Sequence, residues 1–222
     1  MSKKFRTRLE AGQILAKQLT AYASCQDLLV LGLPRGGVPV AFEVAKALGA
    51  SLDICLVRKL GVPGHKELAM GAITMGGIRV LNDDVVDSLG ISSQTIDQVT
   101  ADEFQELQRR DRIYRGARPP VNVKNSTLIV VDDGIATGST MRAAITILQR
   151  QQPKRLVVAV PVAPPEACEQ LKGIVNEVVC LKIPQQMCAV GLWYENFSQT
   201  TDEEVRYLLA KHSSVSNYTV SL

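Results

Sequence analysis

The chain has 222 residues and a formal net charge of +3, and 46% of its residues are hydrophobic. This apolar content supports a folded core and excludes a wholly disordered chain, and so mild a charge gives no sign of a nucleic-acid-binding protein. Only 5% of the residues are aromatic, which suits a parallel sheet buried on both faces by aliphatic side chains.

The longest apolar runs, residues 28–33 and 156–160, are too short to cross a bilayer. The five cysteines are scattered and form no C-x-x-C pair, a pattern typical of free thiols in a reducing compartment. The basic start of the chain is followed by no apolar segment, so we expect no secretory signal. The sequence therefore predicts a cytoplasmic protein without a membrane span.

Helix and strand patterns alternate along the chain, and this alternation predicts βαβ units. Residues 9–22 predict an amphipathic helix, and residues 28–33 predict a buried strand. A helix over residues 38–48, which Gly49 ends, and a second strand over residues 52–57 follow.

The middle of the chain predicts an irregular segment followed by a long helical region. Glycines and a Pro-Gly pair predict a long mobile loop over residues 59–77, with room for a short hairpin. Helix N-caps are expected at Asn82 and at Ser92 or Ser93, and the helical region runs to about Arg115.

The second half continues the alternation of strands and helices. Further strands are predicted over residues 128–131, 155–160 and 177–181, and further helices over 139–151, 164–172 and 202–212. Together these elements predict one α/β domain over residues 1–222, with a central, mostly parallel sheet flanked by helices.

A strand, an acidic pair and a loop of small residues follow one another between residues 128 and 140. The strand ends at Asp132 and Asp133, and ligands collect at that end of the strands in open α/β sheets. The loop runs into a helix, whose first N–H groups and positive dipole end bind phosphate. The candidate phosphate-binding residues are Ala136, Thr137, Gly138, Ser139 and Thr140.

The two acids can serve a sugar that carries this phosphate. Asp132 and Asp133 can accept hydrogen bonds from neighbouring ribose hydroxyls, or neutralise positive charge that develops on the sugar. The simpler alternative is a polar loop in which both aspartates only cap the next helix. No Gly-Lys-Ser/Thr follows, which excludes a Walker-type loop, and the absence of G-x-G-x-x-G disfavours a dinucleotide loop.

A second glycine-rich loop, Pro34-Arg35-Gly36-Gly37, connects the first strand to the next helix. Its glycines allow the backbone to approach a ligand closely, and its N–H groups can point at an anion. Arg35 can hold a phosphate with its planar fork. The alternative is an ordinary glycine-rich turn with an exposed arginine.

Residues 130–140 resemble the signature with which type I phosphoribosyltransferases bind 5-phosphoribosyl 1-pyrophosphate (PRPP): an apolar strand, two acids and a Thr-Gly-x-Thr loop. The resemblance extends from about Phe5 to His212. The segments Leu-Pro-Arg-Gly-Gly-Val-Pro, Arg-Lys-Leu-Gly-Val-Pro-Gly and Trp-Tyr-x-x-Phe are similar to those of a bacterial subgroup of phosphoribosyltransferase-like proteins. The family implies a Rossmann-like core at about residues 24–182 and a small hood from about residues 1–23 and 183–212.

The resemblance also implies roles for the two loops. Asp132 and Asp133 would bind the ribose 2- and 3-hydroxyls, and residues 136–140 would hold the 5-phosphate. Residues 34–37 would form the pyrophosphate loop, which in this family often carries a non-proline cis peptide. Mg²⁺ takes most of its ligands from substrate oxygens and water, so Asp132 and Asp133 would contact it only through ribose hydroxyls or water.

Two cations and a lid are expected on the pyrophosphate side. Arg58 and Lys59 close the second predicted strand, where they face the leaving group or, alternatively, only solvent. Residues 61–76 resemble the mobile lid of orotate-type enzymes, with His65 and Lys66 as its candidate ligands. The subgroup pattern has Asn-Pro at these two positions, which leaves an exposed loop histidine as the alternative for His65.

The aromatic residues Trp193, Tyr194 and Phe197 lie in the expected hood. They could stack on the acceptor base, or they could form hydrophobic core beneath it. Arginines recur every three residues from Arg109 to Arg118, interleaved with acids. This spacing favours a salt-bridged face or a homodimer surface over a face that binds RNA.

The sequence therefore predicts a Mg²⁺-dependent phosphoribosyltransferase with PRPP and a small, nucleobase-like molecule as its partners. The acceptor itself is open, because no residue that would read a base edge is identified. Two alternatives remain. One is a regulatory protein that senses PRPP without turnover, and the other is a hydrolase of a phosphoribosyl compound.

Overall fold

The computed structural model describes residues 3–116 and 118–219, and its centre is a five-stranded parallel sheet. The strands of this sheet are β1 (Leu28–Gly32), β2 (Ser51–Ile54), β6 (Thr127–Val131), β7 (Arg155–Val162) and β8 (Glu177–Lys182). Their order is β2-β1-β6-β7-β8, and every neighbouring pair is parallel. The predicted parallel sheet is confirmed.

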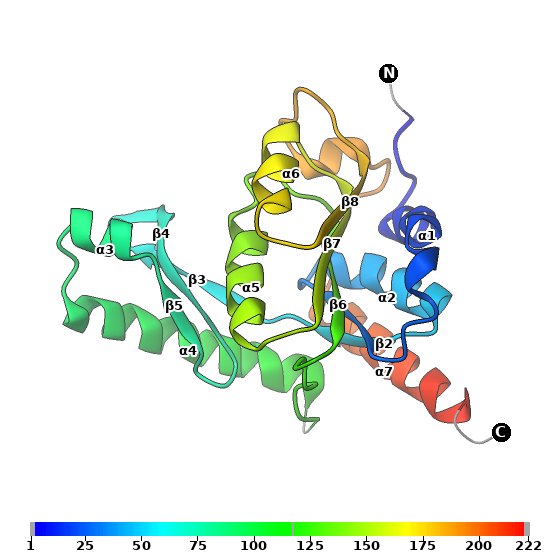
Figure 1. Ribbon diagram of the computed structural model, residues 1–222, viewed down its shortest axis with the longest axis horizontal. Coiled ribbons are helices and arrows are strands. Elements are labelled where there is room, and N and C mark those ends of the chain that lie inside the picture. The colour runs from blue at the N-terminus through cyan, green and yellow to red at the C-terminus, as the bar shows by residue number, and fades with distance from the viewer. Residues whose placement is uncertain (1–2, 117, 220–222) are drawn as a thin grey trace.

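Helices cover both faces of this sheet (Figure 1). They are α1 (Arg8–Gln18) and α2 (Gly37–Leu48) on one face, and α5 (Ser139–Arg150) and α6 (Pro165–Lys172) on the other. The central strand β6 explains why both faces are apolar. Leu128 and Val130 pack against α5 and α6, whereas Ile129 and Val131 pack against the other layer, because successive strand residues point to opposite faces.

The register of β1 and β6 determines where their loops begin. Gly32 pairs with Val131, so the two strands end side by side. The backbone N–H of Leu33 donates to the carbonyl of Val131 at 2.9 Å, which extends this pairing past the end of β1. Both glycine- and acid-rich loops therefore leave the sheet at the same edge.

The segment predicted as a mobile loop, residues 59–77, is instead part of a second sheet. Strands β3 (Val57–Val62), β4 (His65–Thr74) and β5 (Arg79–Leu81) form this three-stranded sheet in the order β3-β4-β5. Buried Leu60, Met70 and Ile73 give it an apolar face. Glycine adopts φ of +80° at Gly64, in the turn between β3 and β4. The hairpin that the prediction allowed for is present, but it is longer than expected, because the glycines mark turns and bulges within strands.

The predicted strand over residues 52–57 is also divided. Its first part is β2 of the central sheet, and its last residue begins β3. Arg58 and Lys59 therefore do not close a parallel strand, as expected, but lie within β3.

Helix α4 (Ser93–Arg115) packs against the second sheet. The short helix α3 (Asp83–Ser88) comes before α4 in the chain. The predicted cap at Ser92 is confirmed, because its side chain accepts a hydrogen bond from Thr95 N at 3.2 Å. Leu107 of α4 packs in one cluster with Leu60 and Met70 of the hairpin. Figure 1 shows α4 running from the second sheet toward the C-terminal helix.

The C-terminal helix α7 (Asp202–Thr219) begins within the residue range of the expected hood and packs against α2 and α4. Its buried Val205 and Leu209 pack in the cluster that includes Phe42 of α2 and Leu107 of α4. Two other segments of the expected hood contact each other, one around Phe5 and one around Tyr194. Phe5 pairs with the segment after the short helix η2 (Val190–Trp193), through Phe5 N to Trp193 O at 2.9 Å.

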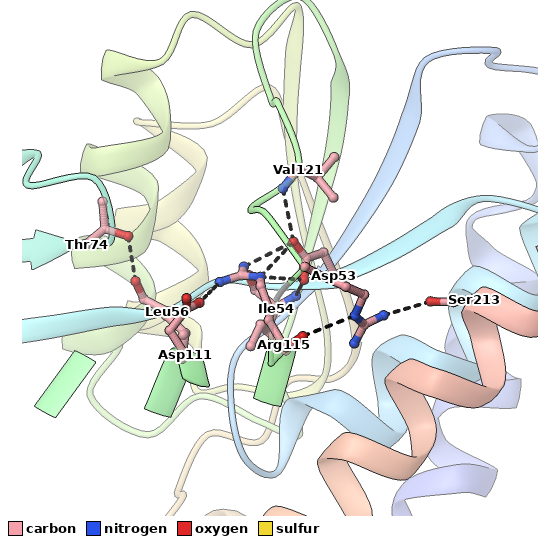
Figure 2. Close-up of polar contacts among 9 residues, drawn as sticks. Asp53, Ile54, Leu56, Thr74, Asp111, Arg115, Val121 and Ser213 are labelled. Carbon is pink, nitrogen blue, oxygen red and sulfur yellow. Dashed lines mark hydrogen bonds and ion pairs between the residues drawn. The ribbon is translucent and has the colours of Figure 1, made fainter. Parts of the chain in front are cut away.

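A buried arginine fixes the C-terminal end of α4 (Figure 2). Arg115, with 6% of its side chain exposed, donates from Nη2 to Asp53 Oδ2 at 3.1 Å and to the carbonyl of Ile54 at 2.7 Å. Asp111, one turn earlier, pairs with the same guanidinium. Arg115 of the arginine repeat thus forms ion pairs, as predicted, but they are buried and join α4 to β2 instead of lying on a solvated helix face.

All five cysteines lie within the described residues, and all are free thiols, as expected. No helix in the part of the chain that the structure describes has the length and apolarity needed to span a membrane.

Candidate active site

The carboxylate pair Asp132 and Asp133 follows β6 directly, and both side chains are half-buried. The backbone N–H of Asp133 donates to Asp132 Oδ1 at 2.8 Å, which fixes the first carboxylate. Burial, and then the adjacent charge of Asp133, raise the pKa of Asp132 well above its ordinary value. A site that raises the pKa of a carboxylate in this way favours ligands that donate hydrogen bonds or carry positive charge.

Arg8, which the sequence did not identify, is the counter-ion of Asp133. Its Nε donates to Asp133 Oδ2 at 2.8 Å, and only 12% and 13% of the two side chains are exposed. Burial raises the pKa of Asp133, and the guanidinium opposes that shift. Arg8 also lies 3.9 Å from the ring centroid of Phe197 and donates to the carbonyl of Ser198 at 2.6 Å. Asp133 therefore joins β6 to the N-terminal helix.

The glycine-rich loop after β1 lies against this acidic pair. A Cβ atom on Gly36 would lie 2.0 Å from Asp133 Oδ2, and one on Gly37 would lie 2.8 Å from the Cα of Asp132. Only glycine permits this approach. The peptide between Pro34 and Arg35 is cis, as the resemblance implied.

The predicted phosphate loop follows the carboxylates in the chain and leads into α5. Gly138 has a φ of +76° and precedes the first helical residue without a side-chain cap. Ala136, Thr137 and Thr140 are exposed. Within the described ranges, the structure gives no protein acceptor for the backbone N–H groups of residues 136–140. These donors are thus available to an anion.

Arg35 points toward the start of α7. Its Nη1 lies 3.7 Å from Asp202 Oδ1, and 35% of its side chain is exposed. The hydroxyl of Tyr114 donates to the same carboxylate oxygen at 2.7 Å, and burial raises the pKa of Tyr114 to about 12. The long Arg35 contact is weaker than a hydrogen bond, so the guanidinium is held only loosely.

A cavity of about 810 Å³ opens between the hairpin, α4 and the two loops. Its lining includes Pro34, Thr140, Arg58, Lys59 and Arg110. Both predicted cations are therefore beside residues of both anion loops, although they reach this place from β3. The Arg58 Nε donates to Glu103 Oε2 of α4 at 2.5 Å, so part of its charge is compensated.

The predicted lid residues lie at the start of β4. His65 is exposed, and the side chain of Lys66 lies outside the described part of the structure. No group of three or more potential metal ligands gathers among the residues that are described.

The aromatic residues of the expected hood pack mainly on one another. Tyr194 is 3% exposed, its ring centroid lies 5.5 Å from that of Phe5, and its hydroxyl donates to the carbonyl of Asp133 at 2.5 Å. Phe197 packs on Tyr194 with centroids 5.1 Å apart and carries Arg8 on its ring. Tyr194 is thus a core residue that supports the acidic pair rather than a wall of an open base pocket. Trp193 is half-buried.

Comparisons with known proteins agree with this arrangement. Residues 6–192 match the model of the phosphoribosyl transferase domain. Curated relatives from two strains of Mycobacterium tuberculosis, provisionally named phosphoribosyl transferases, are 47% identical over 203 residues. That alignment covers 91% of this chain and 46% of each relative, so the chain spans about half their length.

A solved structure is similar over nearly the whole chain. The crystal structure of the protein TT1426 from Thermus thermophilus is 44% identical, with a TM-score of 0.85. The match covers 94% of this chain and 98% of that one. The family model includes both anion loops and the acidic pair between them, and the fold is the one that this pattern implied. This chain belongs to the phosphoribosyl transferase family.

Proposed function

We propose that the protein is a Mg²⁺-dependent phosphoribosyltransferase that transfers the phosphoribosyl group of PRPP to a small, nucleobase-like acceptor and releases pyrophosphate. One observation carries this proposal. The loop of residues 34–37 lies against the pair of carboxylates, so closely that Cβ atoms on Gly36 and Gly37 would collide with it. The loop of residues 136–140 follows the same pair in the chain, and within the described residues its N–H groups have no protein acceptor. PRPP has the matching chemistry: a phosphate at one end, a pyrophosphate at the other, and two ribose hydroxyls between them.

The reaction breaks the bond between the anomeric carbon and pyrophosphate and forms a bond from that carbon to the acceptor. Positive charge develops on the sugar, and negative charge grows on the leaving group. Asp132 and Asp133 would accept the ribose hydroxyls and stabilise the cationic sugar from fixed positions. The N–H groups of residues 136–140 would hold the 5-phosphate and thereby orient the sugar. No protein nucleophile is required.

Mg²⁺ would supply positive charge to the pyrophosphate oxygens when it is bound. Asp132 and Asp133 would contact it through ribose hydroxyls or water, because Mg²⁺ takes most of its ligands from substrate oxygens and water. Arg58 and Lys59, which line the cavity next to Pro34, would bind the leaving group. The β3–β4 hairpin would exclude water, and Trp193 is the aromatic residue that we assign to the acceptor side.

The test is incubation with PRPP, Mg²⁺ and a panel of nucleobases, with pyrophosphate release and nucleotide formation both measured. Acceptor-dependent release with a stoichiometric nucleotide product would support transfer. Release without an acceptor, together with ribose 5-phosphate, would show a hydrolase instead. Calorimetric binding of PRPP without release for any acceptor would leave a sensor, and no binding would refute the proposal.

A further inference from the structure

We infer that Arg110 of α4 binds the pyrophosphate group of PRPP, as a third cation beside Arg58 and Lys59. The inference rests on the proposed function. It adds a residue that belongs to neither of the two predicted anion loops and that was not among the predicted cations Arg58 and Lys59 or the predicted lid residues. In the sequence Arg110 stands beside the arginine repeat, whose spacing indicated only a salt-bridged helix face or a homodimer surface.

The position of Arg110 is the first argument. Its side chain lines the cavity of about 810 Å³ together with Pro34 of one anion loop and Thr140 of the other. An adjoining small cavity has the same three residues in its lining, together with Arg58. A ligand that spans the two loops would therefore lie against Arg110.

The state of its guanidinium is the second argument. Nε donates to Glu106 Oε1 at 2.7 Å, and 31% of the Arg110 side chain is exposed. Within the described residues, the structure gives no acceptor for either Nη atom of Arg110. Hydrogen bonds from Arg109 and Arg110 lower the pKa of Glu106 to about 2, so its carboxylate stays charged at neutral pH. Glu106 thus orients the guanidinium and leaves both Nη groups for an anion.

The third argument is the charge balance of the cavity. Arg58 already pairs with Glu103 at 2.5 Å, and Asp102 and Glu103 both line the cavity. A pyrophosphate carries several negative charges, and a lysine with one partly compensated arginine balances them poorly. Arg110, fixed from behind by Glu106, supplies planar, bidentate binding at the same place.

Arg109 provides a matched control, because it binds the same Glu106 from the adjacent position. Its Nε and Nη2 donate to the two oxygens of Glu106 at 2.7 and 2.9 Å, and 56% of its side chain is exposed. Arg109 is not among the residues that line the cavity. Removing either arginine therefore removes one positive charge and its ion pair with Glu106, whereas only the removal of Arg110 takes a group out of the cavity.

The experiment compares wild type, Arg110→Ala, Arg110→Lys and Arg109→Ala by calorimetric titration with three probes: PRPP with Mg²⁺, inorganic pyrophosphate with Mg²⁺, and ribose 5-phosphate. We expect Arg110→Ala to weaken PRPP and pyrophosphate binding by roughly 10- to 100-fold, the range for losing hydrogen bonds to a charged group. Arg110→Lys should recover part of that loss, since it restores the charge without the fork. Ribose 5-phosphate, which lacks the pyrophosphate, should bind all four proteins equally and so verify their folding.

The outcomes separate the two proposals. Wild type that binds no PRPP refutes the proposed function, and this inference with it. If wild type binds PRPP and Arg110→Ala binds pyrophosphate as tightly as wild type does, the inference alone is refuted. An equal loss in Arg109→Ala and Arg110→Ala also refutes it, because the effect would then follow net charge or Glu106. If Arg110→Ala weakens ribose 5-phosphate as much as pyrophosphate, Arg110 supports the fold and does not select the leaving group.

Discussion

Replacing Arg8 by methionine tests how strongly the acidic pair depends on its buried counter-ion. The variant leaves Asp133 charged and half-buried without a partner, while methionine retains apolar contact with Phe197. Removing one partner of a buried ion pair costs about 3–5 kcal/mol of unfolding free energy. The 2.8 Å contact and the 12% and 13% exposure of the two side chains place this pair in that class.

The matched control is Arg6→Met. Arg6 also makes a 2.8 Å contact through Nε to a carboxylate, that of Glu10, but 70% of its side chain is exposed. Exposed pairs contribute little to stability, because water already solvates both charges. We therefore expect Arg6→Met to unfold almost as wild type does, although the geometry of the two contacts is the same.

The penalty in Arg8→Met should depend on pH with a definite sign. Burial raises the pKa of Asp133 in the folded protein, and Arg8 opposes that shift. Without Arg8 the folded-state pKa rises further, so the variant loses more stability than wild type as the pH increases. At about pH 4, where the buried carboxyl of the variant is protonated, only the lost Ser198 hydrogen bond and ring contact remain, at about 1–2 kcal/mol.

The assay is equilibrium urea unfolding of the three proteins at about pH 7.5 and about pH 4. Equal destabilisation by Arg6→Met and Arg8→Met at the higher pH would refute the assignment of Arg8 as a buried counter-ion. An Arg8→Met penalty that is the same at both pH values would show that the carboxylate of Asp133 is not the group left unpaired.

Further substitutions test other parts of the site. Gly36→Ala places a Cβ 2.0 Å from Asp133 Oδ2, so we expect PRPP affinity to fall at least about tenfold. The control is Gly173→Ala, which should bind PRPP as wild type does, because no atom lies nearer than 3.8 Å to its Cβ. Equal PRPP affinities of the two variants would contradict the close approach of Gly36 to Asp133. Asp132→Asn should lower kcat by roughly ten- to a thousandfold yet raise stability at neutral pH. Its raised pKa means that ionisation costs folding free energy, a cost that disappears as the pH falls below the ordinary value of 3.8, and urea unfolding across pH would detect a variant that is no more stable. Arg115→Met should lower the unfolding free energy by about 3–5 kcal/mol, and a change below about 1 kcal/mol would show that its pairs with Asp53 and Asp111 contribute no more than surface pairs.

Local patterns carried most of the prediction. The strand, the two acids and the loop that ends at Thr140 are contiguous, so their geometry follows from the edge of a parallel sheet. The extent of the hairpin was underestimated, because glycines within β3 and β4 have the same sequence signal as a mobile loop. Arg8 was missed for a different reason: it is separated by 125 residues from Asp133, and no local spacing indicates such a contact.

Arg110 also shows that a sequence pattern does not reveal which side chains meet in the folded protein. Its place next to Arg109 was visible in the sequence, but only the packing of α4 beside the hairpin decides which of the two arginines lines the cavity. Tyr194 likewise had two interpretations of equal standing in the sequence. Its burial and its bond to the carbonyl of Asp133 decide for the core.

Any tilt of helix α4 would pivot about its C-terminal end, which a buried ion pair attaches to the central sheet. Near its C-terminus Arg115 attaches it to β2, and near its N-terminus Asp97 binds Arg79 of the second sheet at 2.7 Å. Its 23 residues, at about 1.5 Å each, make it roughly 35 Å long. A tilt of about 5° at the anchored end would therefore displace the far end by roughly 3 Å. The hairpin shares its core with this helix, so any closing motion of the hairpin would move the N-terminal part of α4 with it. The displacement would be smallest at Arg115 and still small at Arg110, roughly 7.5 Å along the helix from that anchor.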